Sequence, residues 1–182
     1  MTGPRRLLQA LRRRPALLRA SEGAASVEFV LIFPVLMLVI LSSFELGMVT
    51  LRQVMLDRGL DLTVREVRLG QITPVDHATV SASICNHALL LPDCASNLRL
   101  EMRPLDLRSW VTPPEQADCV DRADITVPLR RFTAGVENQL MLLRACSLFD
   151  PYFPTSGLGA RLPRQSGGAY ALTSASAFVV EP

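Results

Sequence analysis

The stretch that decides the fold is FVLIFPVLMLVILSSF, residues 29–44. Its sixteen residues carry no charge and are mostly apolar. Extended to residues 24–51, the segment contains only two charges, Glu28 near its start and Glu45 near its end. A helix of that length covers about 40 Å at roughly 1.5 Å per residue, which is enough to cross a lipid bilayer once. We therefore expect residues 24–51 to form a transmembrane helix.

Charge is distributed unevenly about this helix. Residues 1–23 contain six arginines and one acid, whereas the chain from Ala24 onward contains 13 arginines and 16 acids. A basic flank before a first membrane helix stays in the cytoplasm. The sequence thus predicts a cytoplasmic leader at residues 1–23 and an exported domain at residues 52–182. Because the arginines abut the apolar run and lack interleaved aromatic residues, we expect no nucleic-acid partner.

A cleaved signal peptide has a similar outline, with a basic start followed by an apolar run. Two features oppose that reading here. The run is long, and no small-x-small cleavage site follows Phe44, where the chain continues as Glu45-Leu46-Gly47. We expect the helix to remain attached to the exported part.

An amphipathic pattern continues beyond the apolar run. Apolar residues recur at helical spacing at Leu56, Leu60, Val64 and Val67, so one helix is predicted from about residue 24 to about residue 69. Proline at position 34 is tolerated within a membrane helix, and glycine at position 59 costs about 1 kcal/mol in a helix interior. A second helix is predicted to begin with Thr73 as its cap and to run to about residue 90.

From residue 98 onward the helical pattern of apolar residues gives way to short apolar or alternating stretches, which are separated by Pro, Gly and Asp. A loop is predicted at residues 151–168, which contain three prolines and four glycines. The predicted fold class is α+β, with a long N-terminal helix, a second helix and a small, mainly antiparallel sheet of about three or four strands. The strand candidates are Leu98–Met102, Ala123–Leu129, Gln139–Leu148 and Tyr170–Val180.

All four cysteines lie in the part predicted to be exported. An even number in an oxidising compartment favours two disulfides. Of the three possible pairings we favour Cys85 with Cys94 and Cys119 with Cys146, and the other two pairings stay open. Cys85, His87 and Cys94 supply only three zinc ligands at irregular spacing, so no metal site is expected.

Catalytic motifs do not stand out in this sequence. It contains no nucleophile elbow, P-loop, zinc-protease motif or dinucleotide fingerprint. His77 and His87 are ten residues apart on the second predicted helix, so they should point in nearly opposite directions at the surface. Asp118, Asp121 and Asp124 are expected to form a solvated acidic loop. We therefore expect no catalytic residue, no cofactor, no small-molecule substrate and no enzymatic activity.

Glu28 is the residue that most strongly indicates a function. A carboxylate inside the margin of a membrane helix is costly and usually has a partner. Alternatively, Glu28 lies in the headgroup zone and needs none. The local sequence, EGAASVEFVLIFP at residues 22–34, favours the first interpretation.

This segment resembles the cleavage region of TadE-like minor pilins, or pseudopilins, of the tight-adherence (Tad, Flp-type) pilus. In that family a prepilin peptidase cuts after a glycine that is followed by four residues and then Glu-Phe or Glu-Tyr. The resemblance implies cleavage between Gly23 and Ala24, which makes Glu28 the fifth residue of the mature protein, followed by Phe29. The sequence Phe-Glu-Leu-Gly at residues 44–47 is also similar to the family's usual apolar-Glu-Leu-Gly.

The resemblance implies a non-enzymatic minor pilin or pseudopilin that takes part in Tad pilus assembly and surface adherence. It would reside in a bacterial inner membrane, with its N-terminus cytoplasmic and its C-terminal domain periplasmic, and could be incorporated into a pilus. Its partners would be the prepilin peptidase and other pilins or pilus-assembly proteins. The alternative is an uncleaved single-pass membrane protein whose exported domain binds a partner or forms a structural part of a secretion or pilus complex.

Overall fold

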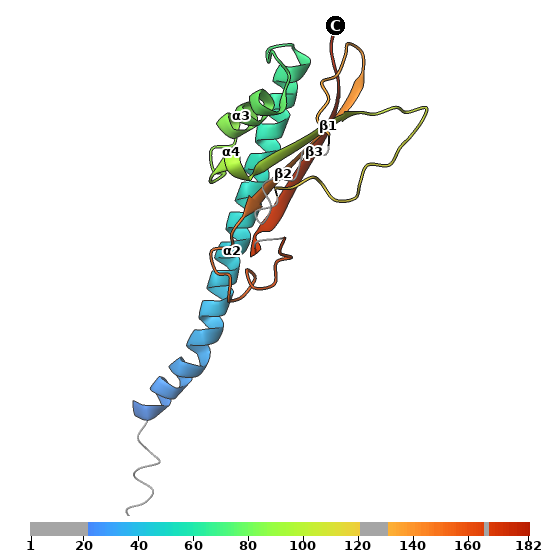
Figure 1. The fold of residues 1–182 in the computed structure, drawn as a ribbon. Coiled ribbons are helices and arrows are strands. Elements are labelled where there is room, and N and C mark those ends of the chain that lie inside the picture. The colour runs from blue at the N-terminus through green and yellow to red at the C-terminus, as the bar shows by residue number, and fades with distance from the viewer. Residues whose placement is uncertain (1–21, 121–130, 166–167) are drawn as a thin grey trace, which may run out of the picture. The chain divides into compact units, whose positions relative to one another are not determined.

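The computed structural model describes residues 22–120, 131–165 and 168–182 (Figure 1). The chain divides into two compact units, the first ending at Leu41 and the second running from Ser42 to Pro182. The α+β fold class is confirmed. The elements are α2 (Glu22–Arg68), α3 (His77–His87), α4 (Cys94–Asn97), β1 (Leu98–Pro104), β2 (Leu140–Phe149) and β3 (Tyr170–Val179).

The sheet has three antiparallel strands in the order β1-β2-β3. Cys146 of the central strand pairs with Arg99 of β1 on one side and with Thr173 of β3 on the other. All three strands begin within one residue of the predicted starts. The fourth strand candidate, Ala123–Leu129, lies outside the described residues.

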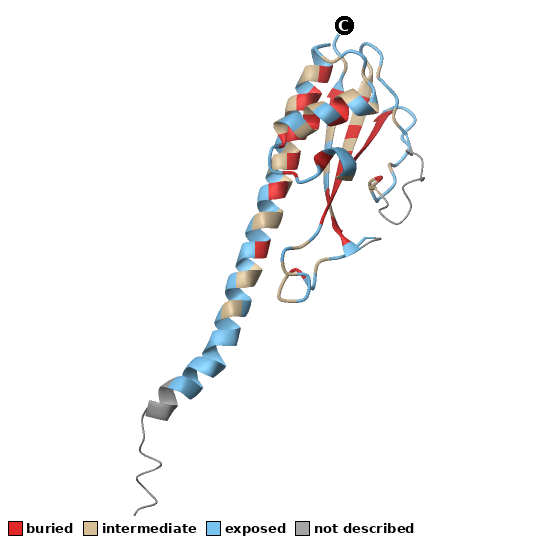
Figure 2. Ribbon diagram, turned by 60° about the vertical axis from the view of Figure 1, so that its left-hand side comes forward, coloured by how far each residue is buried: buried red, intermediate tan, exposed pale blue. Residues whose placement is uncertain are grey.

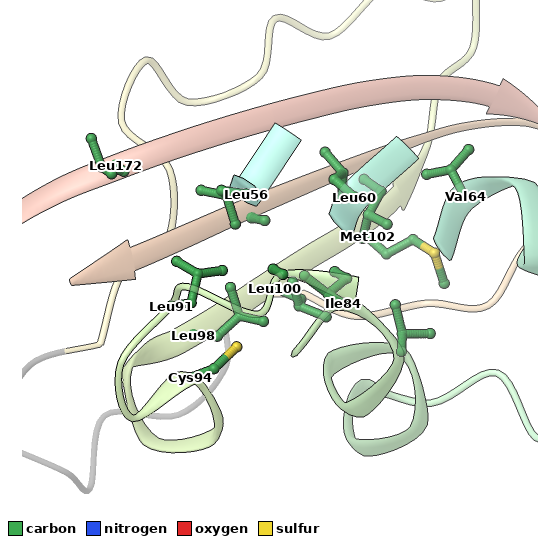
Figure 3. Close-up of a cluster of buried hydrophobic side chains, with 14 of the residues drawn as sticks. Leu56, Leu60, Val64, Ile84, Leu91, Cys94, Leu98, Leu100, Met102 and Leu172 are labelled. Atoms are coloured by element: carbon green, nitrogen blue, oxygen red, sulfur yellow. The ribbon is translucent and has the colours of Figure 1, made fainter. Parts of the chain in front are cut away.

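The main core lies between the second part of α2, helix α3 and one face of the sheet. Figure 2 shows the buried positions as a stripe along one side of α2. That stripe contains the four apolar residues expected from the helical spacing, and all four are buried. In Figure 3, Leu56 and Leu60 of α2 lie close to Leu100 and Met102 of β1 and to Ile84 of α3.

The second helix begins and ends differently from the prediction. Its cap is Asp76 rather than Thr73, and it ends at His87 instead of residue 90. The carboxylate of Asp76 accepts the backbone N–H of Thr79 at 2.8 Å, while the Thr79 hydroxyl accepts the N–H of Asp76 at 3.2 Å. This reciprocal pair satisfies two amides that would otherwise lack partners at a helix start, and it lowers the pKa of Asp76.

Both histidines are partly exposed, and each has a partner that the sequence did not predict. The N–H of Leu100 donates to Nε2 of His77 at 3.3 Å, and the ring of His77 packs edge-on against Phe132. His87 lies 2.9 Å from a carboxylate oxygen of Glu66. The sequence spacing alone could not reveal these partners, since they come from other elements.

The expectation of a solvated acidic loop is wrong for its first residue. Asp118 is buried and forms an ion pair with Arg99 of β1 at 3.1 Å. Asp121 and Asp124 lie outside the described residues. The loop is held to the sheet next to this ion pair by a disulfide between Cys119 and Cys146.

The second disulfide joins Cys85 of α3 to Cys94 at the start of α4. The two cysteines are nine positions apart in the sequence, and their bond ties two consecutive helices together. Both pairs are those favoured from the sequence.

Candidate functional site

The apolar side chains of the first unit are exposed along α2. Phe29, Leu31 and Val35 are 61%, 69% and 65% exposed, and none of the most apolar part of the helix is buried inside the protein. By length and composition, residues 26–68 include a segment able to cross a membrane. An isolated helix that is apolar all round is stable in lipid, where its backbone groups are satisfied internally. This helix therefore indicates a membrane anchor.

Glu28 lies near the start of this apolar surface. Its side chain is exposed, and it makes no hydrogen bond or ion pair with any residue of the described ranges. The following residue, Phe29, stacks on Phe33 one turn along, with ring centroids 5.0 Å apart. Gly23 and Ala24 lie in the first turn of α2. Glu28 is thus one helical turn beyond Ala24, at a separation of four residues.

A second carboxylate of α2, Glu45, has the opposite environment. It is completely buried near the start of the second unit. Its oxygens accept the backbone N–H groups of Tyr152, at 2.9 and 3.2 Å, and of Phe153, at 3.1 Å. The rings of both residues pack edge-on against Phe44. The loop after β2 is thereby fastened to α2 by both polar and aromatic contacts.

Arg52, two turns after Glu45, extends the same attachment. Its guanidinium lies 4.9 Å from the ring centre of Phe149 and 4.8 Å from that of Tyr152, and it donates to the hydroxyl of Tyr170 at 3.2 Å. Burial raises the pKa of Tyr170, and the hydrogen bond from Arg52 opposes this shift. The two rings give the buried guanidinium favourable cation–π contacts, which a more strongly hydrated lysine would form less readily.

No role was expected for Glu45 and Arg52 from the sequence, although a signal was present. Counting back from Leu56 by three or four residues gives positions 52, 49 and 45, which continue the buried stripe of α2. Hydropathy obscured this continuation because both charges lie among apolar residues. The second compact unit begins at Ser42, and the boundary of the exported domain at residue 52 stays a prediction.

Residues 23–65 match the model of the family described as TadE-like protein. This segment of the chain is similar to the TadE-like family. No curated protein and no solved structure matches the chain. The TadE-like segment contains the apolar helix, Glu28, Glu45 and most of the buried stripe of α2. The match supports a Tad pilus-associated protein, and it ends before α3 and the sheet.

The rest of the described chain offers little for metal chemistry. No group of three or more His, Cys, Asp and Glu side chains that could hold a metal ion occurs within residues 22–120, 131–165 and 168–182. Cys85 and Cys94, considered with His87 as zinc ligands, are joined to each other in a disulfide.

Proposed function

We propose that this protein is a non-enzymatic minor pilin or pseudopilin of the Tad pilus. In this proposal a prepilin peptidase removes residues 1–23, and the mature subunit, anchored in the inner membrane with its second unit in the periplasm, takes part in pilus assembly and surface adherence. The observation that carries the proposal is the uncovered apolar helix in which Glu28, five residues after Gly23, is the only charge between Ala24 and Phe44.

Cleavage would create a positive amine on Ala24 close to lipid. The segment from Ala24 to Leu41, ahead of the second unit, would be about 27 Å long at roughly 1.5 Å per residue. That length is close to the roughly 30 Å hydrocarbon thickness of a bilayer. When subunits pack together, Glu28 of one copy would neutralise the Ala24 amine of its neighbour, because two opposite charges in a low-dielectric environment favour pairing over separate burial.

The mature N-terminus tests processing. The full chain is expressed with and without a prepilin peptidase, and its intact mass is measured. With the peptidase, we expect a product that begins at Ala24, while Gly23→Ala should retain the full mass. A wild-type chain that keeps its leader in the presence of an active peptidase would instead support the uncleaved single-pass anchor.

The pairing role of Glu28 has a separate test. Glu28→Gln should still be cleaved but should no longer co-purify with the major pilin after crosslinking. The matched control is Glu137→Gln, which removes an exposed acid from the second unit. Normal co-assembly of the Glu28→Gln subunit would contradict pairing between subunits and leave an intramolecular pair as the role of the acid.

A further inference from the structure

The face of β1 that points away from the core carries three charged residues at alternate positions, Arg99, Glu101 and Arg103. All three are more than nine-tenths buried. Arg99 is paired with Asp118, and Glu101 lies 3.6 Å from Nη1 of Arg144 on the neighbouring strand. Two of the three buried charges on this face therefore have an opposite charge beside them.

Arg103 differs from the other two. Its exposed fraction is 8%, and no acid of the described residues forms an ion pair with it. Arg99 and Glu101 also have a buried atom without a hydrogen bond, but each is ion-paired, whereas Nε and Nη2 of Arg103 have no partner among the described residues. Its neighbour in the strand register is Leu142, whose side chain cannot accept a hydrogen bond. A guanidinium keeps its charge at physiological pH, so it cannot reduce the free-energy cost of burial by becoming neutral. Leaving such a charge unpaired is strongly unfavourable, which indicates that an anion belongs beside it.

A small cavity lies where that anion would bind. It has a volume of about 150 Å³, and Arg103 and Arg131 both line it. Asp106 is the one acid among the described residues that line it, and one of its oxygens already accepts the backbone N–H of Arg108 at 2.8 Å. Since a water molecule occupies about 30 Å³ in the liquid, the cavity has room for about five waters. A carboxylate or phosphate group fits that space.

We propose that this cavity binds a single oxyanion group, either a carboxylate or a phosphate. Arg103 lines the cavity, and because its Nε and Nη2 are covered by other atoms, Nη1 is the donor left for such a group. Arg131 adds a second positive charge, and Ser109 adds a hydroxyl donor. Trp110 and Val111, 57% and 71% exposed, give the cavity an apolar rim.

Calorimetric titration of the full chain in detergent micelles tests the site. The probes are sodium phosphate and sodium acetate at pH 7, with sodium chloride used to hold the ionic strength constant. We expect saturable one-site binding of at least one probe. Preference for phosphate would indicate a tetrahedral ligand, and preference for acetate a planar carboxylate. If neither probe gives saturable binding, the proposal is wrong.

Three variants locate the site. Arg103→Met should abolish saturable binding and should unfold at the same or a higher temperature in chloride, because it removes a buried unpaired charge while retaining the length of the side chain. Arg131→Gln, at an exposed position, should weaken binding at least tenfold. Arg108→Gln, which removes an exposed arginine from the same segment, should bind like the wild type. Equal binding by Arg103→Met and the wild type would overturn the assignment.

Discussion

The carboxylate of Glu45 accepts the backbone N–H of Tyr152 at 2.9 Å, although 107 residues separate the two in the chain. This bond fastens the loop after β2 to the part of α2 where the second unit begins. In the unfolded chain, water would hydrogen-bond to this carboxylate. In the folded protein the carboxylate is fully buried, and the backbone N–H groups of Tyr152 and Phe153 donate to it in place of water. The contact is therefore sensitive to any change that removes the acceptor.

Glu45→Ala should destabilise the protein by about 2–4 kcal/mol, since it removes charge-assisted hydrogen bonds and leaves backbone donors unpaired in a buried site. Glu45→Gln should have a smaller effect because its amide oxygen can still accept one of the bonds. Denaturant unfolding of the full chain in detergent measures both. If Glu45→Ala were as stable as the wild type, the loop attachment would contribute nothing to the fold.

At Gly59 of α2, the C-terminal part of α3 lies close to the helix backbone. A Cβ at this position would lie 2.9 Å from the carbonyl oxygen of Ile84 and 3.0 Å from Cβ of Ala88. Glycine to alanine in an exposed helix gains about 1 kcal/mol, but overpacking costs about 1–3 kcal/mol. We therefore expect Gly59→Ala to lower the unfolding temperature.

The matched control is Gly47→Ala on the same helix, where nothing lies within 4 Å of the added methyl group. This variant should be equal to or more stable than the wild type, by up to about 1 kcal/mol. Thermal unfolding followed by circular dichroism compares the two. A stabilising effect at both positions would show that α3 does not constrain Gly59.

Periodicity along the chain was sufficient to predict the long helix, its buried stripe and the three described strands. It succeeds there because the helix from Leu56 to Val67 and the apolar strands bury residues at the spacing set by helix and strand geometry.

Periodicity was insufficient where a residue from another part of the chain decides whether a side chain is buried. Asp118 is buried because Arg99 lies opposite, and no local pattern encodes that pair. The helix cap was misplaced because Thr73-Pro74 and Asp76-x-x-Thr79 are competing start signals, and only the second forms reciprocal hydrogen bonds.

His77 should make stability depend on pH in the weakly acidic range. Burial, and then the nearby positive charge of Arg99, lower the pKa of His77 below its usual 6.5, while Asp76 and Asp118 oppose this shift. The unfolded chain consequently binds a proton more readily than the folded chain. The contribution of neutral His77 to the free energy of unfolding is fully present above about pH 6.5, and it is lost as the pH falls towards the pKa of His77 in the folded protein. Protonation would also prevent Nε2 from accepting the N–H of Leu100.

We expect His77→Gln to reduce the loss of unfolding free energy between pH 7.5 and pH 5.5, because glutamine does not titrate and can still accept a hydrogen bond. His87→Gln leaves His77 in place, so this variant should still show the loss of unfolding free energy that His77 causes between pH 7.5 and pH 5.5. Denaturant unfolding at a series of pH values makes the comparison. Parallel pH profiles for the wild type and His77→Gln would exclude His77 as the source.

The two disulfides should differ in how much they stabilise the fold. Cys119–Cys146 closes a separation of 27 residues and Cys85–Cys94 one of nine. A crosslink restricts the unfolded chain more when it closes a longer loop, and the loop-entropy model gives a difference of roughly 1 kcal/mol between these two. Replacing Cys119 and Cys146 with alanine should therefore lower the unfolding free energy more than the same change at Cys85 and Cys94. Denaturant unfolding of the two double variants under non-reducing conditions measures the difference, and the reverse order would mean that native packing around Cys85–Cys94 outweighs loop length.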